Sequence, residues 1–279
     1  MKKILLTILV LILISCNAEN KKSTEELNVL FIGNSLTFYH EMPLMVQKML
    51  NETNPNIKIH QSTFPGMFLD WHLNKTILTQ NEESINVRNK KEGEITETER
   101  KLSERKWDII ILQEGTIRVI IPESRNLVVD SSIKKFKKIV NNPNCKFILF
   151  NTWASKAEYP LEKCYPGRLI DKSLESSKKY CSESIENLEQ HNDVINQAYQ
   201  KLADNNNILK SNNGNLFYEI RIKHPEIELF DDSFHPSVYG SFLNACEFYQ
   251  ILSNEKAIDL KYNGEIEPEV ANLLKKIAE

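Results

Sequence analysis

Short strand-like runs alternate along this chain with longer amphipathic runs, and this alternation constrains the fold more than any other feature. The strand-like runs are mostly apolar and lie at residues 28–32, 57–62, 107–112 and 146–150, with a shorter one at 208–209. Such short apolar runs are typical of strands buried on both faces of a parallel sheet. Helical spacing is expected at residues 42–50, 68–78, 131–140, 183–205, 239–252 and 268–278. We therefore predict an α/β domain with a mainly parallel sheet and right-handed crossovers.

Length and composition fit one folded domain over residues 28–279. The chain has 279 residues, and its 41% hydrophobic fraction is ample for a core, while 8 glycines and 10 prolines are too few for a disordered or fibrous chain. No repeat or Pro/Gly/Ser-rich linker divides it, but we expect polar insertions at about residues 81–105 and 154–182. The net charge of −3, without a basic stripe, argues against nucleic acid as a partner.

The N-terminal residues are expected to direct export rather than to fold. Two lysines precede an apolar stretch that is too short to span a bilayer, and Leu13-Ile14-Ser15-Cys16 resembles a bacterial lipoprotein box. We predict a signal peptide over residues 1–15, a lipid anchor on Cys16 that holds the protein to a bacterial membrane, and a polar tether over residues 16–27. A plain secretory signal is the alternative, but Leu13 fits its cleavage site poorly.

The remaining cysteines suit an exported protein better than a metalloprotein. Cys164 and Cys181 flank a polar segment and are candidates for a disulfide, whereas Cys246 lies in an apolar helical run and is expected to be a buried thiol. No cysteine pair has C-x-x-C spacing, and the six histidines are scattered. We therefore predict neither a metal site nor a cofactor.

Chemically active residues follow the predicted strands directly, at the carboxyl ends where open parallel sheets place their sites. Ser35 follows the first strand, Gly66 the second, Gln113 the third and Asn151 the fourth. Asp232-Ser233-Phe234-His235-Pro236 precedes a C-terminal helix. A serine, a histidine and an aspartate three residues before it are the components of a Ser-His-Asp hydrolase. Ser35 alone could instead cap the following helix.

Two of these segments resemble the SGNH/GDSL hydrolase superfamily. Leu30 to Thr37 is similar to its first block in the form Gly-Asn-Ser, and Asp232 to Pro236 is similar to its last block. The resemblance implies a three-layer α/β/α sandwich with a flavodoxin-like sheet and an ester substrate. It also implies that Ser35 is the nucleophile, that His235 is the base and that Asp232 orients the imidazole. The N–H groups of Ser35 and Gly66 would then form the oxyanion hole.

The chain departs from that family where the third strand ends. The family usually has an asparagine there, whereas this chain has Leu112-Gln113-Glu114. Gln113 carries the same amide on a longer side chain and is the first candidate for a third oxyanion donor, and Asn151 is the second. Asp231 competes with Asp232 as the triad acid, and His72 competes with His235 as the base.

The substrate is less sharply defined by the sequence. Trp153 could stack on a sugar ring or could be a core aromatic, and Asn151 could also contact substrate. An envelope anchor favours an extracellular or periplasmic ester, so we expect a carbohydrate O-acetyl or acyl esterase. The alternatives are a catalytically inactive glycan-binding surface lipoprotein with the same fold and, less favoured, an acyl transferase.

Overall fold

A computed structural model of the protein describes residues 25–81 and 83–279. The predicted signal peptide, the lipidation site at Cys16 and most of the predicted tether therefore lie outside the described residues. Within the described part of the chain, no helix is both long and apolar enough to cross a membrane.

Five parallel strands form the central sheet in the order β2-β1-β5-β6-β9. They are β1 (Leu27–Gly33), β2 (Ile57–Thr63), β5 (Ile109–Leu112), β6 (Lys146–Leu149) and β9 (Leu209–Lys210). Successive residues of β1 face opposite sides of the sheet, so Val29 and Phe31 enter one apolar cluster while Leu30 and Ile32 enter the other. Burial on both faces explains why the central strands β1, β5 and β6 are mostly apolar, whereas the edge strands β2 and β9 contain polar and exposed residues. The strand order is flavodoxin-like and confirms the predicted fold class.

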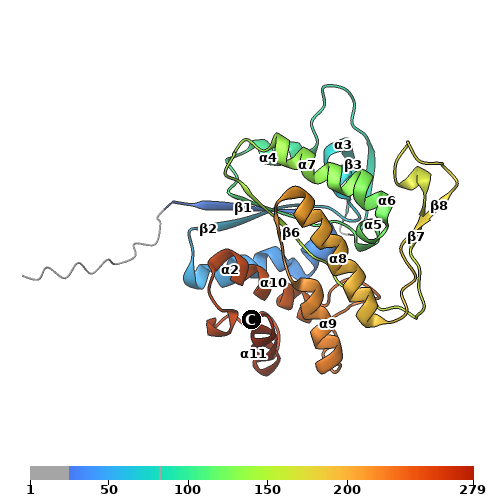
Figure 1. Ribbon diagram of the computed structural model, residues 1–279. Helices are drawn as coiled ribbons and strands as arrows, with labels where there is room; N and C mark the ends of the chain where they lie inside the picture. The colour runs from blue at the N-terminus through green and yellow to red at the C-terminus, as the bar shows by residue number, and fades with distance from the viewer. Residues whose placement is uncertain (1–24, 82) are drawn as a thin grey trace, which may run out of the picture.

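Helices cover both faces of this sheet and produce three layers (Figure 1). One face packs against α2 (Met42–Thr53), α9 (Asn213–Lys223), α10 (Val238–Ser253) and α11 (Pro268–Ile277). The other face packs against α3 (Leu69–Asn74), α4 (Glu97–Ser103), α5 (Thr116–Ile120), α7 (Asp130–Ile139) and α8 (Leu188–Asn206). Shorter pieces are α1 (Ser35–Phe38), η1 (Tyr39–Glu41), α6 (Pro122–Ser124), the π-helical η2 (Arg125–Val129), η3 (Gly167–Leu169) and η4 (Ala257–Asp259).

The helix predicted over residues 68–78 is wrong in its second half. The helix α3 ends at Asn74, and β3 (Lys75–Gln80) pairs with the antiparallel strand β4 (Ile85–Asn89). The β-branched residues Thr76 and Ile77 favour an extended strand, which explains the change. The segment 81–105 therefore contains a strand and the short helix α4, which begins with a capping box between Thr96 and Glu99.

The segment 154–182 forms a second hairpin at the same end of the sheet. Its strands are β7 (Cys164–Pro166) and β8 (Lys179–Cys181), and Cys164 and Cys181 are joined by a disulfide. Cys246 is completely buried in α10, as the sequence predicts.

Candidate active site

Ser35 lies at the turn where β1 becomes α1. The N-cap is Asn34, whose side-chain oxygen accepts a hydrogen bond from the N–H of Leu36 at 3.2 Å. Ser35 is therefore the first helical residue rather than the cap, and its hydroxyl is not used in capping. Its backbone N–H has no intrahelical acceptor, because the first N–H groups of a helix have none.

His235 lies on a short turn whose geometry is set by Asp232. One carboxylate oxygen of Asp232 accepts hydrogen bonds from the backbone N–H groups of Phe234 and His235, both at 2.7 Å. The other oxygen contacts Nδ1 of His235 at 2.6 Å. Burial by itself raises the pKa of the Asp232 carboxyl, but these hydrogen bonds outweigh it and lower that pKa. Asp232 is therefore held as a carboxylate against the imidazole.

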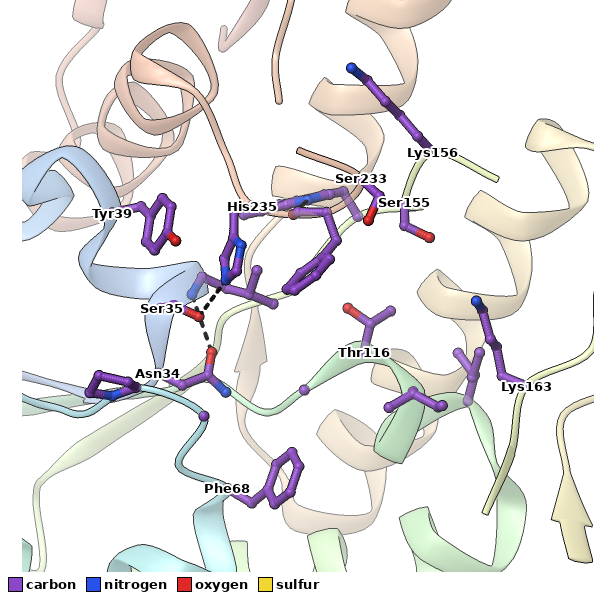
Figure 2. A pocket seen from close by; sticks show the side chains of 18 of the residues that line it. Asn34, Ser35, Tyr39, Phe68, Thr116, Ser155, Lys156, Lys163, Ser233 and His235 are labelled. Carbon is purple, nitrogen blue, oxygen red and sulfur yellow. Dashed lines mark hydrogen bonds between the residues drawn. The ribbon is translucent and has the colours of Figure 1, made fainter. Parts of the chain in front are cut away.

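The imidazole of His235 meets the hydroxyl of Ser35 across the cavity floor. Nε2 of His235 lies 2.8 Å from Oγ of Ser35 (Figure 2). The ring of Tyr39 stacks on the imidazole with centroids 4.2 Å apart and planes 4° apart, and Phe234 packs on it at 4.0 Å. Two aromatic rings thus fix the orientation of the histidine. Tyr39 belongs to no recognisable motif, so the sequence did not indicate that it contacts the histidine.

Trp153 stabilises the backbone of the turn that bears His235. Its indole N–H donates to the carbonyl of Phe234 at 3.0 Å, and its ring stacks on Phe217 at 4.0 Å and 5°. Only 2% of Trp153 is exposed, so it has no open face for a sugar ring. Of the two alternatives, a sugar-stacking face and a core aromatic, the structure favours the core aromatic: Trp153 lines the cavity and positions the backbone beside His235.

Gly66 lines the same cavity as Ser35. Its φ is +62°, and a Cβ there would have no atom within 4 Å. The left-handed backbone conformation, rather than lack of space, therefore calls for glycine at this turn.

Gln113 does not reach the cavity, which corrects its predicted role as an oxyanion donor. Its Oε1 accepts hydrogen bonds from the N–H of Asn34 at 2.8 Å and from the hydroxyl of Thr37 at 3.1 Å. The residue is fully buried, and its Nε2 is enclosed without a partner among the described residues. A Cβ on Gly33 would lie 2.5 Å from Oε1 of Gln113. Gln113 therefore supports the turn that carries Ser35 from beneath.

Asn151 is likewise a structural residue and not a substrate or oxyanion ligand. It is fully buried, and its Oδ1 accepts a hydrogen bond from the N–H of Gly214 at 2.9 Å at the start of α9. The side chain thus joins the end of β6 to a helix on one face of the sheet. Both amides were predicted from their place at strand ends, but their side chains turn away from the cavity.

The two competing residues have other partners. His72 is completely buried, with Nδ1 2.7 Å from the Thr98 hydroxyl and Nε2 3.0 Å from the Gly33 carbonyl oxygen. Asp231 contacts Nε2 of His40 at 2.7 Å. Neither residue lies at the hydroxyl of Ser35, so His235 and Asp232 are the better candidates for the catalytic roles.

A cavity of about 740 Å³ opens above Ser35 and His235, over the carboxyl ends of the strands. Both insertions contribute to its wall, through Glu83 from one and Lys156, Lys163 and Tyr165 from the other. Both predicted insertions therefore lie at the site. In the described part of the chain, one group of three potential metal ligands lies close together, at Glu162, Cys164 and Cys181, but the disulfide occupies both sulfur atoms.

Comparison with known proteins finds similarity among solved structures. No protein-family model and no curated protein matches the sequence. A DUF4886 family protein from Bacteroides uniformis matches with a TM-score of 0.66 and 16% identity, over 91% of this chain and 93% of that one.

Two further solved structures carry a hydrolase description. A protein assigned as an SGNH hydrolase from Slackia heliotrinireducens matches with a TM-score of 0.54 and 18% identity, over 81% of this chain and 98% of that one. A protein assigned as a GDSL-like lipase from Parabacteroides merdae matches with a TM-score of 0.51 and 13% identity, over 82% and 96%. The chain therefore has the α/β/α fold of the SGNH and GDSL-like hydrolases.

Proposed function

We propose that the protein is a serine ester hydrolase in which Ser35 is the nucleophile, His235 the general base and Asp232 the residue that orients the imidazole. One observation carries the proposal: Ser35, His235 and Asp232 form an unbroken series of contacts of 2.8 and 2.6 Å at the cavity floor. When Nδ1–H of His235 donates to the Asp232 carboxylate, Nε2 is left as an acceptor for the Ser35 hydroxyl.

The reaction follows from this arrangement. Oγ of Ser35 attacks the ester carbonyl carbon while Nε2 of His235 takes the hydroxyl proton, giving a tetrahedral intermediate. The carbon–oxygen bond to the alcohol then breaks, and Nε2–H returns the proton to the departing alcohol. Water, activated by the same nitrogen, hydrolyses the acyl-serine and restores the hydroxyl of Ser35. Asp232 stays ionised throughout and stabilises the imidazolium.

Two backbone donors are available for the oxyanion. The N–H of Ser35 lies at the start of α1, and Gly66 lines the same cavity from the neighbouring turn. Preorganised N–H groups of this kind stabilise the negative oxygen of the intermediate, and the loss of one donor costs about 10²–10³ in rate.

For the biological substrate, we extend the proposal to an O-acetylated or O-acylated carbohydrate at the bacterial cell envelope. The lipoprotein-like segment ending at Cys16 supports the location. The open cavity of about 740 Å³ supports a substrate larger than a simple acetate ester.

The test compares Ser35→Ala with the unchanged protein on 4-nitrophenyl acetate and on acetylated glycans. The variant is expected to lose at least about 10³-fold in kcat/KM, because the nucleophile is absent. Ser155→Ala is the matched control, since Ser155 lines the same cavity and should leave the rate within about twofold. Full activity of Ser35→Ala would overturn the proposal.

The second candidate function is a catalytically inactive glycan-binding lipoprotein with this fold. One observation favours it: the buried amides of Gln113 and Asn151 give the cavity no side-chain oxyanion donor at those positions. A folded protein that binds acetylated glycans but hydrolyses none of them would support this alternative.

A further inference from the structure

The cavity carries a cationic side chain on the side away from the nucleophile. Figure 2 shows Lys163 on the opposite side of the cavity from Ser35 and His235, with Thr116 between them. A substrate that is bound at Ser35 and is long enough to cross the cavity can therefore reach the ammonium group of Lys163. The inference below rests on the proposed ester hydrolase and concerns the class of its substrate.

The backbone of Lys163 is fixed in place. Its N–H donates to the Ser182 hydroxyl at 3.1 Å, and its carbonyl accepts from the N–H of Ser182 at 2.8 Å. The next residue, Cys164, is bonded to Cys181. Lys163 therefore directly precedes the first strand of a cross-linked hairpin, which fixes its backbone beside the cavity.

The ammonium of Lys163 has no hydrogen-bond or ion-pair partner among residues 25–81 and 83–279, although the residue is half-buried. Lys156, the other lysine at the cavity, differs in this respect. Its ammonium pairs with Glu228 at 2.8 Å and lies 5.6 Å from the centroid of Phe230. The ammonium of Lys163 is therefore available to pair with an anion in the cavity, whereas that of Lys156 is already paired.

Glu162 and His191, two ionisable groups near Lys163, do not pair with its ammonium. Oε2 of Glu162 lies 3.5 Å from Sγ of Cys164. His191, also at the cavity, has its pKa lowered to about 4 by burial and by the positive charges of Lys163 and Arg221. His191 is thus neutral at pH 7, and Lys163 supplies the positive charge on this side of the cavity.

We infer that the substrate is an ester with an anionic oxygen group, such as a carboxylate, remote from the scissile bond, and that Lys163 binds this group. The anion can belong to the acyl part or to the alcohol part of the ester. In either case Lys163 acts as a specificity-determining residue. A charge-assisted hydrogen bond of this kind is expected to change kcat/KM about tenfold or more.

The experiment uses two pairs of esters that differ in charge. Mono-4-nitrophenyl glutarate and 4-nitrophenyl pentanoate test an anion on the acyl part, and 4-acetoxybenzoate and its methyl ester test an anion on the alcohol part. Lys163→Ala should lower kcat/KM about tenfold or more for the anionic member of at least one pair, and leave the neutral member within about twofold. Lys163→Arg should retain the preference, and Lys156→Ala, the matched control, should alter neither member.

Two results would overturn the inference. Either Lys163→Ala lowers kcat/KM equally for the anionic and the neutral esters, or it leaves kcat/KM unchanged for both. This failure is distinct from failure of the proposed function, which would show as hydrolysis of the neutral esters that survives in Ser35→Ala. A binding measurement without turnover completes the test. Calorimetry should show that Ser35→Ala binds 4-acetoxybenzoate or glutarate about tenfold more tightly than Ser35→Ala/Lys163→Ala does. If the two variants bind each anion with the same affinity, the inference is contradicted.

Discussion

At the scale of single residues, Gln113 shows how the sequence can point to the right region and the wrong role. It lies next to the turn that bears Ser35, as predicted, but it is not an oxyanion donor. The end of the third sheet strand suggested an amide that donates to an oxyanion. The side chain instead presents its oxygen to the N–H of Asn34 and the hydroxyl of Thr37. The direction in which a side chain at a strand end points depends on its packing against residues far away in the chain. A single sequence does not show which of those residues it will contact.

Replacing Gln113 with leucine should therefore affect stability as well as rate. The buried N–H of Asn34 would lose its acceptor, and a buried unsatisfied donor costs about 1–3 kcal/mol in the free energy of unfolding. Denaturant unfolding of Gln113→Leu measures this loss, with Ser155→Ala as a control that should stay within about 0.5 kcal/mol. Unchanged stability together with a rate loss of about 10² or more would instead identify Gln113 as an oxyanion donor.

At the scale of secondary-structure elements, His72 links three elements near the site. It connects β1, the strand that precedes Ser35, with the helices α3 and α4. The side chain projects from α3, contacts the carbonyl oxygen of Gly33 at the end of β1, and contacts Thr98 in α4. Thr98 also contacts Ser62 in β2 at 2.9 Å. Burial lowers the pKa of His72 to about 4, although its hydrogen bond to Gly33 opposes this shift.

This contact should make stability depend on pH. The ordinary histidine pKa is about 6.5, so between pH 6.5 and 4 the unfolded chain binds a proton that folded His72 does not. The contribution of His72 to stability is therefore complete above pH 6.5 and is lost as the pH falls toward 4, by up to about 3 kcal/mol. Glu114, whose burial raises its pKa to about 7, changes stability in the opposite direction as the pH falls from 7 to 4.5.

The comparison of the unchanged protein with His72→Gln isolates the histidine, because Glu114 is common to both. At pH 7 the variant should be less stable, and the difference in unfolding free energy should shrink as the pH falls below 6.5. Denaturant unfolding at several pH values measures this difference. Parallel curves for the two proteins would show that His72 does not titrate as a buried neutral side chain.

The elements themselves were predictable where burial is two-sided. The strands β1, β5 and β6 follow the predicted apolar runs closely, because both of their faces are covered. Prediction failed for α9, whose buried residues Leu216, Phe217 and Ile220 lie in a segment without a strong helical pattern. It failed also at β3, where tertiary pairing with β4 replaces the expected helix. The capping box at Thr96 is a local signal that would have located α4.

At the scale of the whole molecule, the fold brings together groups that are 200 residues apart in the chain. Ser35 follows β1, and His235 lies just before α10, which packs on the same face of the sheet as α2. Ser35, Asp232 and His235 could be proposed from sequence because each belongs to a short motif. Tyr39 and Lys163 could not, because they reach the cavity only through the packing of η1 and of the β7–β8 hairpin.

The most direct test of the central claim is labelling by a fluorophosphonate, which reacts with an activated serine. Mass spectrometry of the intact and digested protein should show one adduct, on Ser35, that is absent from Ser35→Ala and unaffected by Ser155→Ala. Labelling of His235→Ala should be at least about 10²-fold slower, because the base is missing. A folded protein that is not labelled, or equal labelling of the unchanged protein and His235→Ala, would contradict the assignment of Ser35 as a nucleophile activated by His235.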